Sequence, residues 1–221
     1  MEYEKYIIDN IMSMSGKYTP YQIFTDWITL SAISIQNACK LIHDKTYEHR
    51  EELYCNVAKK YSADELRILS NMTGALSLLL GDKMCDVLGE IYMKAGCGNK
   101  NTGQFFTPYN LSYLTASLIY GNQFNQSEDE QIEINEPSTG GGGMMIAIAQ
   151  VAKEHGIDYQ RKLHVIAQDL DWNGVYMTYI QLSLLGVRAI VVQGDTLMDP
   201  YRKGYDECRV FRTPAEEGVL I

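Results

Sequence analysis

The sequence has few positive charges for its length. Its 221 residues include 19 Lys and Arg against 28 Asp and Glu, which gives a formal net charge of −9. Binding to phosphate groups is driven by clustered Lys and Arg. The charge balance therefore argues against a chain that binds nucleic acid without help. Any contact with DNA is expected to need a local basic patch or a partner subunit.

Paired cysteine motifs and long apolar runs are also missing. The five cysteines are odd in number and show no CxxC spacing, which predicts reduced thiols in a cytoplasmic protein and indicates no metal site. The N-terminal stretch carries Glu2, Glu4 and Asp9 and lacks a long apolar run. We therefore expect neither a signal peptide nor a membrane span.

The first hundred residues are predicted to form a helical region. Thr19 and Gln22 match a capping box, and Ser62 and Glu65 match a second one. The apolar residues that follow each box recur at helical spacing, so they are interpreted as core packing. A glycine-containing loop follows, and Thr107-Pro108 are predicted as the cap and first position of the next helix.

From residue 131 the pattern alternates between strand and helix. Short strands are predicted at 131–135, 163–167 and 189–192. The intervals between them are long enough for helical crossovers, so the strands are expected to be parallel and buried. The predicted fold class is therefore α/β, with a helical region over 1–100 and a second domain over 101–221.

Four consecutive glycines follow the first predicted strand, in the stretch Glu136 to Gly143. Such a run is costly in backbone entropy and is often only a flexible turn. It is useful where a ligand lies against bare backbone and a helix N-terminus points amides at it. Asp169 and Asp195 follow the second and third strands, and ligands bind beyond the carboxyl ends of such strands. Together these positions favour a ligand site.

An adenosine-containing ligand fits this set of residues. A carboxylate at Asp169 can accept both ribose hydroxyls, and Asp195 can accept from the adenine amino group. Glu136 beside the glycines would favour a cationic group over phosphate. Because a G-x-G-x-x-G motif is also absent, a nicotinamide cofactor is the weaker interpretation.

Four motifs, in this order, resemble a known family, the adenine-specific DNA methyltransferases that form the modification subunit of type I restriction-modification systems. The resemblance covers roughly residues 82–200 and implies a truncated, Rossmann-like methyltransferase sheet with S-adenosylmethionine as cofactor. The segment Asp86 to Tyr92 is also similar to the one that precedes the phenylalanine-rich motif in that family. The four motifs are Gly103-Gln-Phe-Phe-Thr-Pro108, Glu136-Pro-Ser-Thr-Gly-Gly-Gly-Gly143, Gln168-Asp169 and Gly194-Asp-Thr-Leu197.

The resemblance also implies roles for individual residues. Phe106 to Pro108 would border the methionine end, and Glu136 to Gly142 would wrap it. Asp169 would hold the ribose and Asp195 the adenine. The expected cofactor-binding residues are Phe106, Thr107, Pro108, Glu136, Pro137, Ser138, Thr139, Gly140, Gly142, Asp169, Leu170, Asp195 and Thr196.

The chain departs from the family in two ways. The first-strand motif is usually Asp-Pro-Ala-Cys-Gly-Thr-Gly-Gly, from which several positions here differ, Glu136 among them. The catalytic Asn-Pro-Pro-Phe/Tyr motif, which holds the target amine and stacks on the flipped base, is missing. Asp199-Pro200-Tyr201 comes too soon after the third strand, and Thr213-Pro214 supplies neither amide nor aromatic ring. No catalytic residue is therefore assigned.

The same departure affects the expected partners. In the usual strand order a fourth strand lies against the first, so the first strand's edge would be exposed here. The tail at 209–211 or 219–221, a second copy of the chain or a methyltransferase partner is expected to cover it. The sequence predicts an S-adenosylmethionine-binding relative of DNA adenine methyltransferases that reaches DNA with a partner. The alternative is a catalytically silent regulatory module that complements a partner methyltransferase.

Overall fold

The computed structural model describes residues 2–97, 106–121, 124 and 131–219. The N-terminal region is helical, as predicted, and both capping boxes are present: the side chain of Thr19 accepts from the Gln22 amide, and that of Ser62 from the Glu65 amide. Most of the segment 122–130, which precedes the first strand, lies outside the described residues. The helices of this region are α1 (Glu2–Ser13), α2 (Pro20–Ala38), α3 (Lys45–Ala58), α4 (Ala63–Asp82) and α5 (Val87–Lys94).

A four-stranded sheet in the order β1-β2-β3-β4 forms the second half of the fold. The first three strands are parallel, as the alternating pattern predicts, and the last is antiparallel to β3. The fold is therefore α/β and Rossmann-like. The elements are α6 (Tyr109–Tyr120), β1 (Ile132–Glu136), α7 (Gly143–Glu154), α8 (Tyr159–Lys162), β2 (Leu163–Asp169), α9 (Trp172–Leu184), β3 (Arg188–Gln193), a 3-10 turn (Glu207–Arg209) and β4 (Val210–Arg212).

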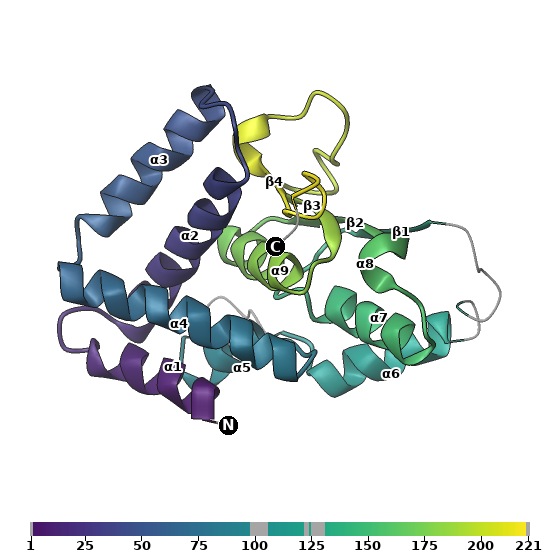
Figure 1. The fold of residues 1–221 in the computed structure, drawn as a ribbon, viewed down its shortest axis with the longest axis horizontal. Coiled ribbons are helices and arrows are strands. Elements are labelled where there is room, and N and C mark those ends of the chain that lie inside the picture. Colours follow the sequence, from purple (N-terminus) through teal and green to yellow (C-terminus); the bar gives the residue numbers. More distant parts are fainter. Residues whose placement is uncertain (1, 98–105, 122–123, 125–130, 220–221) are drawn as a thin grey trace.

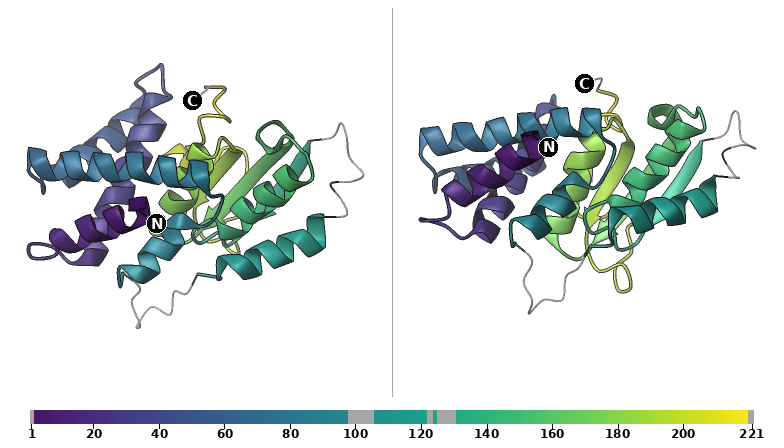
Figure 2. Two further views of the ribbon diagram at one scale, coloured as in Figure 1. Left: turned by 60° about the horizontal axis from the view of Figure 1, so that its bottom comes forward. Right: turned by 90° about the horizontal axis from the view of Figure 1, so that it is seen from below.

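Helices α7 and α9 pack beside each other against the sheet, and α2, α4 and α5 pack on α9 in turn (Figure 1). Helix α6 lies along the outer side of α7, as further views show (Figure 2). One apolar core runs from Ile7 in α1 to Phe211 in β4. The N-terminal helical region therefore supports α9, the helix that follows β2. This support holds the carboxyl ends of the strands in place.

Of the two tail segments expected to cover β1, 209–211 does not do so, and most of 219–221 lies outside the described residues. Residues 210–212 pair with β3 instead, at the opposite edge of the sheet. Among the described residues no strand pairs with the outer edge of β1, and only Ile134 of that strand is buried. The expectation that all three parallel strands are buried is thus wrong for β1.

Two side chains hold the tail at this edge. Arg50 of α3 is 4% exposed, donates from Nη2 to the carbonyls of Glu207 (3.0 Å) and Val210 (2.7 Å), and lies over the Phe211 ring. Burial lowers the pKa of its guanidinium. Thr213 is fully buried; its hydroxyl donates to Val187 O at 2.7 Å and accepts from the Ala189 amide at 2.9 Å. Thr213 therefore extends the β3–β4 pairing with its side chain.

Replacing Thr213 with valine is expected to destabilise the fold by about 1–3 kcal/mol, because the isosteric side chain leaves a buried amide and carbonyl short of a partner. The measurement is urea unfolding followed by circular dichroism. Thr213→Ser keeps the hydroxyl and should lose much less stability. Equal midpoints for the valine variant and the wild type would show that the hydroxyl does not support the tail.

Candidate functional site

The glycine turn after β1 has two residues that require glycine for their backbone conformation. Gly140 and Gly142 have φ values of +54° and +87°, in the left-handed region that other residues rarely adopt. A Cβ on Gly142 would lie 3.0 Å from the hydroxyl of the buried Thr178. Helix α7 starts at Gly143, so the turn presents the amides of a helix N-terminus.

The other two glycines are explained by a buried carboxylate that packs against the turn. A Cβ on Gly141 or Gly143 would lie 2.8 or 3.3 Å from Oδ2 of Asp86. Asp86 is 4% exposed and caps α5 by accepting from the Gly89 amide at 2.9 Å. Its Oδ1 also accepts from Gln181 Nε2 at 2.9 Å, and that nitrogen donates to Gly141 O at 2.7 Å. Burial raises the pKa of Asp86, against the opposing effect of these donors.

A cavity of ≈ 240 Å³ opens between the turn, the start of α6 and Asp86. Two carboxylates line it, Asp86 and Glu136, and its described walls contain no Lys, Arg or His. A cationic occupant would therefore suit the described part of this cavity. The lining residues are Asp86, Phe106, Thr107, Ser112, Glu136, Ser138, Thr139, Gly140, Gly141, Gly143 and Met144.

Six predicted site residues thus meet around one cavity. They are Phe106, Thr107, Glu136, Ser138, Thr139 and Gly140. Phe106 reaches this position because its ring packs edge-on against Tyr92 of α5, with centroids 5.3 Å apart. Residues 103–105 of the same motif lie outside the described residues. Helix α6 begins at Tyr109 rather than at Pro108, so Thr107 does not cap it and faces the cavity instead.

Asp169 is joined to the turn from the end of β2. Its Oδ2 accepts from the Gly140 amide at 2.7 Å, and its Oδ1 accepts from the Asp171 amide at 2.9 Å. Gly174 of α9 allows this approach, since a Cβ there would lie 2.9 Å from the Asp169 carboxyl carbon. A carboxylate offers about four acceptor sites, so the half-buried Asp169 keeps capacity for further donors.

The remaining predicted residues surround this arrangement without lining the cavity. Asp195 is half-buried after β3, where its Oδ1 accepts from the amides of Leu197 and Met198. The Thr196 hydroxyl donates to Pro137 O at 2.6 Å, which ties the loop after β3 to the loop after β1. Pro108 is exposed, and the Leu170 side chain is 67% exposed.

Asp86, Ser112 and Met144 also line the cavity, although none of them was an expected site residue. Asp86 occupies an N-cap position three residues before Gly89, and such spacing indicates only a helix start. Its approach to the glycine turn depends on Gln181, which lies 95 positions further along the chain. A sequence pattern could not have revealed that contact.

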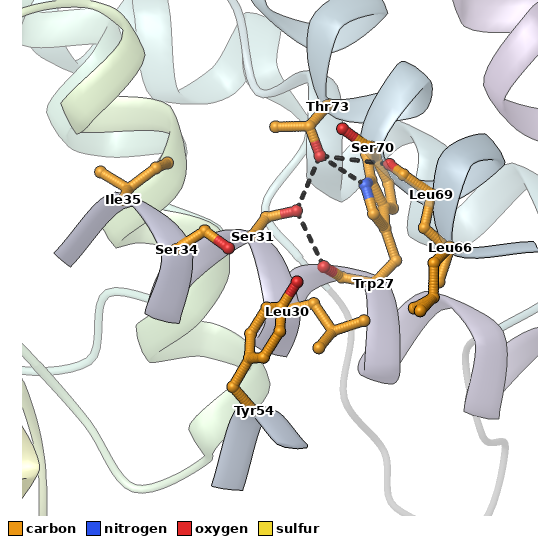
Figure 3. A pocket seen from close by; sticks show the side chains of 10 residues that line it. All are labelled: Trp27, Leu30, Ser31, Ser34, Ile35, Tyr54, Leu66, Leu69, Ser70 and Thr73. Atoms are coloured by element: carbon orange, nitrogen blue, oxygen red, sulfur yellow. Dashed lines mark hydrogen bonds between the residues drawn. The ribbon is translucent and has the colours of Figure 1, made fainter. Parts of the chain in front are cut away.

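A second, smaller cavity of ≈ 140 Å³ lies among α2, α3 and α4 (Figure 3). Three of its polar groups bond to one another: Trp27 Nε1 donates to the Thr73 hydroxyl at 3.0 Å, and the Ser31 hydroxyl lies 2.8 Å from the same oxygen. Because these groups already have partners, this cavity is a weaker candidate than the one beside the glycine turn.

The described part of the chain contains no cluster of three or more His, Cys, Asp or Glu that could hold a metal ion. No helix in the same part is long and apolar enough to cross a membrane.

Comparison with known proteins identifies the family. The profile of the family N-6 DNA Methylase matches residues 83–211, more than half of the chain. No curated protein matches the sequence. One similar solved structure is described as a putative class I S-adenosylmethionine-dependent methyltransferase of Listeria monocytogenes, with 12% identity, a TM-score of 0.47 and coverage of 90% of this chain and 55% of that one.

Another similar structure is the methyltransferase subunit of a type I restriction-modification system from Streptococcus thermophilus, with 14% identity, a TM-score of 0.48 and coverage of 84% of this chain and 42% of that one. The chain thus spans about half the length of either protein. The family match confirms the family predicted from the four motifs, and the segment from Asp86 onward falls inside it. The chain belongs to the N-6 DNA methylase family.

Proposed function

We propose that this chain binds S-adenosylmethionine and serves as the donor-binding part of a DNA adenine methyltransferase. The observation that carries the proposal is that the glycine turn, an acidic cavity and the Asp169 carboxylate lie together at the sheet edge where Asp195 follows β3. When bound, the cofactor supplies an activated methyl group. Its methionine end carries positive charge, which suits a cavity whose described walls contain two carboxylates and no cation.

The proposed contacts follow from position along the sheet edge. The turn and Phe106 to Pro108 would enclose the methionine end, since most of these residues line the cavity. Asp169 has free acceptor capacity for the ribose hydroxyls. Asp195 follows the neighbouring strand β3 and would reach the adenine. Leu170 and Thr196 flank these two carboxylates in sequence.

Removal of the Asp169 carboxylate tests the proposal. We expect Asp169→Ala to weaken S-adenosylmethionine binding by about 1–3 kcal/mol, because ribose hydroxyls and the Gly140 amide lose their acceptor. Isothermal titration calorimetry with S-adenosylmethionine, S-adenosylhomocysteine and NAD measures this directly. The first two should bind the wild-type chain, whereas NAD should not.

Asp64→Asn is the matched control, because it removes an exposed carboxylate that pairs with Arg67 in α4. It should bind the cofactor as the wild type does. Unchanged affinity in Asp169→Ala would remove Asp169 from the site. Absence of binding by the wild-type chain would refute the proposed function itself.

The acceptor side of the reaction is proposed to come from outside these 221 residues. The outer edge of β1 is unpaired among the described residues. That edge suits a further strand from a partner methyltransferase or a second copy. DNA would be bound with that partner, since the net charge of −9 disfavours tight binding by the chain alone.

A catalytically silent module that complements such a partner is the second candidate. The open β1 edge supports it equally. The two candidates differ in whether the assembled complex transfers methyl groups with the donor bound in this chain.

A further inference from the structure

Asp86 is the least exposed carboxylate at the site, and it takes no part in the ribose and adenine contacts. It is 4% exposed, lies under the glycine turn and lines the cavity. Two amide-type donors, the Gly89 N–H and Gln181 Nε2, both bond to Oδ1. Among the described residues Oδ2 has no hydrogen-bond donor, although it is the oxygen nearest to Gly141 and Gly143.

A helix cap alone does not account for this arrangement. Capping α5 requires one oxygen acceptor, which an Asn or Ser side chain provides equally well. A buried carboxylate without a cationic partner is costly in a folded chain. No Lys, Arg or His stands among the described residues of the cavity wall that could offset the charge. Within the described residues of the wall no cation offsets this charge, and a cation that entered the cavity would compensate it.

We infer that Asp86 receives the α-ammonium group of the bound methionine moiety through Oδ2, and so selects for ligands that carry this group. The inference rests on the proposed function, because it assigns a residue to the same cofactor. An ammonium group suits Oδ2 better than a sulfonium does, because it offers N–H donors to an oxygen that lacks one. Gly141 and Gly143 fit the same account, since a side chain at either position would crowd that oxygen.

Gln181 fixes the orientation of this carboxylate. Its Nε2 bonds both Asp86 Oδ1 and Gly141 O, while its Oε1 accepts from the Leu88 amide at 3.0 Å. Gln181 is fully buried in α9. The side chain thus locks Asp86, the turn and the start of α5 together, so that Oδ2 faces the ligand and Oδ1 faces the protein.

The test compares two ligands that differ only in the α-amino group: S-adenosylhomocysteine and its analogue that lacks this group. By calorimetry the wild-type chain should bind S-adenosylhomocysteine at least tenfold more tightly than the analogue. Asp86→Asn should lose this preference while keeping the analogue affinity within about twofold, because Asn still caps the helix. Asp44→Asn makes the same change at the N-cap of α3 and should keep the full preference.

The thermal unfolding temperature provides a second measurement. A purely structural role of Asp86 would change this temperature in the opposite direction. Because burial raises the pKa of Asp86, the ligand-free fold holds a proton more tightly than the unfolded chain does. The stability from that proton is present at low pH and falls as pH rises through the folded pKa. Asp86→Asn should therefore unfold at an equal or higher temperature than the wild type at pH 7.5, without ligand.

Two results would overturn the assignment of Asp86 to the ammonium group. Equal weakening of both ligands together with a lower unfolding temperature would show that Asp86 is structural. Unchanged selectivity in Asp86→Asn would show that the group is recognised elsewhere. If the wild-type chain binds neither ligand nor S-adenosylmethionine, the proposed function has failed, a result that does not depend on Asp86.

Discussion

Gly142→Ala is expected to abolish detectable S-adenosylmethionine binding and to lower the stability of the fold by about 2–5 kcal/mol. The residue has a φ of +87°, and a left-handed conformation costs a residue with a side chain roughly 1–2 kcal/mol. The added methyl group would also lie 3.0 Å from the Thr178 hydroxyl and 3.3 Å from its Cα. Overpacking of a filled interior costs typically about 1–3 kcal/mol more.

Loss of binding is expected because Thr178 holds the glycine turn in place. This buried hydroxyl donates to Gly140 O at 3.0 Å and lies 3.1 Å from the Thr139 hydroxyl. Displacing it would shift the turn that forms one wall of the cavity and the Gly140 amide bonded to Asp169. Calorimetry and urea unfolding measure the two effects separately.

Gly81→Ala is the control for the loss of a glycine. Gly81 lies in α4, and a methyl group added there would meet no heavy atom within 4 Å outside its own stretch of helix. Alanine at this position is expected to leave binding unchanged and to be neutral or stabilising by about 0.5–1 kcal/mol, because it favours the helix. Normal cofactor affinity in Gly142→Ala would show that the turn backbone is not the binding surface.

The strand and helix pattern was predictable because it depends on local signals. Capping boxes at Thr19 and Ser62, Gly186 just after α9 and the alternating or apolar patterns of the strands all act over a few residues. The convergence of Glu136, Asp169 and Asp195 follows from parallel strands alone, since their carboxyl ends share one edge of the sheet. That part of the site needed no contact between distant residues.

What could not be predicted depends on long-range contacts. Pairing of residues 210–212 with β3 rather than β1 is supported by Arg50, which bonds a carbonyl 157 positions away, and by Thr213, which bonds one 26 positions away. Two of the four glycines are needed because Asp86 packs beneath them, across more than fifty residues of chain. Neither contact can be inferred from the composition or from the periodicity of apolar residues.

The same long-range contacts occupy the segments that could have served as an acceptor site. Asp199 O accepts from Gln168 Nε2 at 2.9 Å, and the Tyr201 amide donates to Gln168 Oε1 at 3.0 Å. Asp199 also pairs with Arg202 at 2.9 Å. The segment Asp199-Pro200-Tyr201 is therefore bound to the end of β2, and Thr213 is bound to β3. Neither segment is paired with β1, against which the fourth strand of the family would lie.

The purified 221-residue chain is accordingly expected to bind the donor but to transfer a negligible amount of tritiated methyl to mixed-sequence DNA. The exocyclic amine of adenine is weakly nucleophilic, because its lone pair is delocalised into the ring. Acceptor groups must orient that amine in line and stabilise the developing positive charge. Glu136, Asp169 and Asp195 are proposed to hold the donor, which leaves the acceptor side without assigned groups.

Scintillation counting of DNA after incubation with the labelled donor gives the measurement, with donor binding by the same preparation verified by calorimetry. Asp199→Asn should remain inactive, because the altered segment stays bound to Gln168 at the end of β2. Addition of a partner chain that carries an Asn-Pro-Pro-aromatic motif is expected to restore transfer, and Gly142→Ala should prevent that rescue. Robust, donor-dependent methylation of adenines by the purified chain alone would instead place the acceptor groups within these residues.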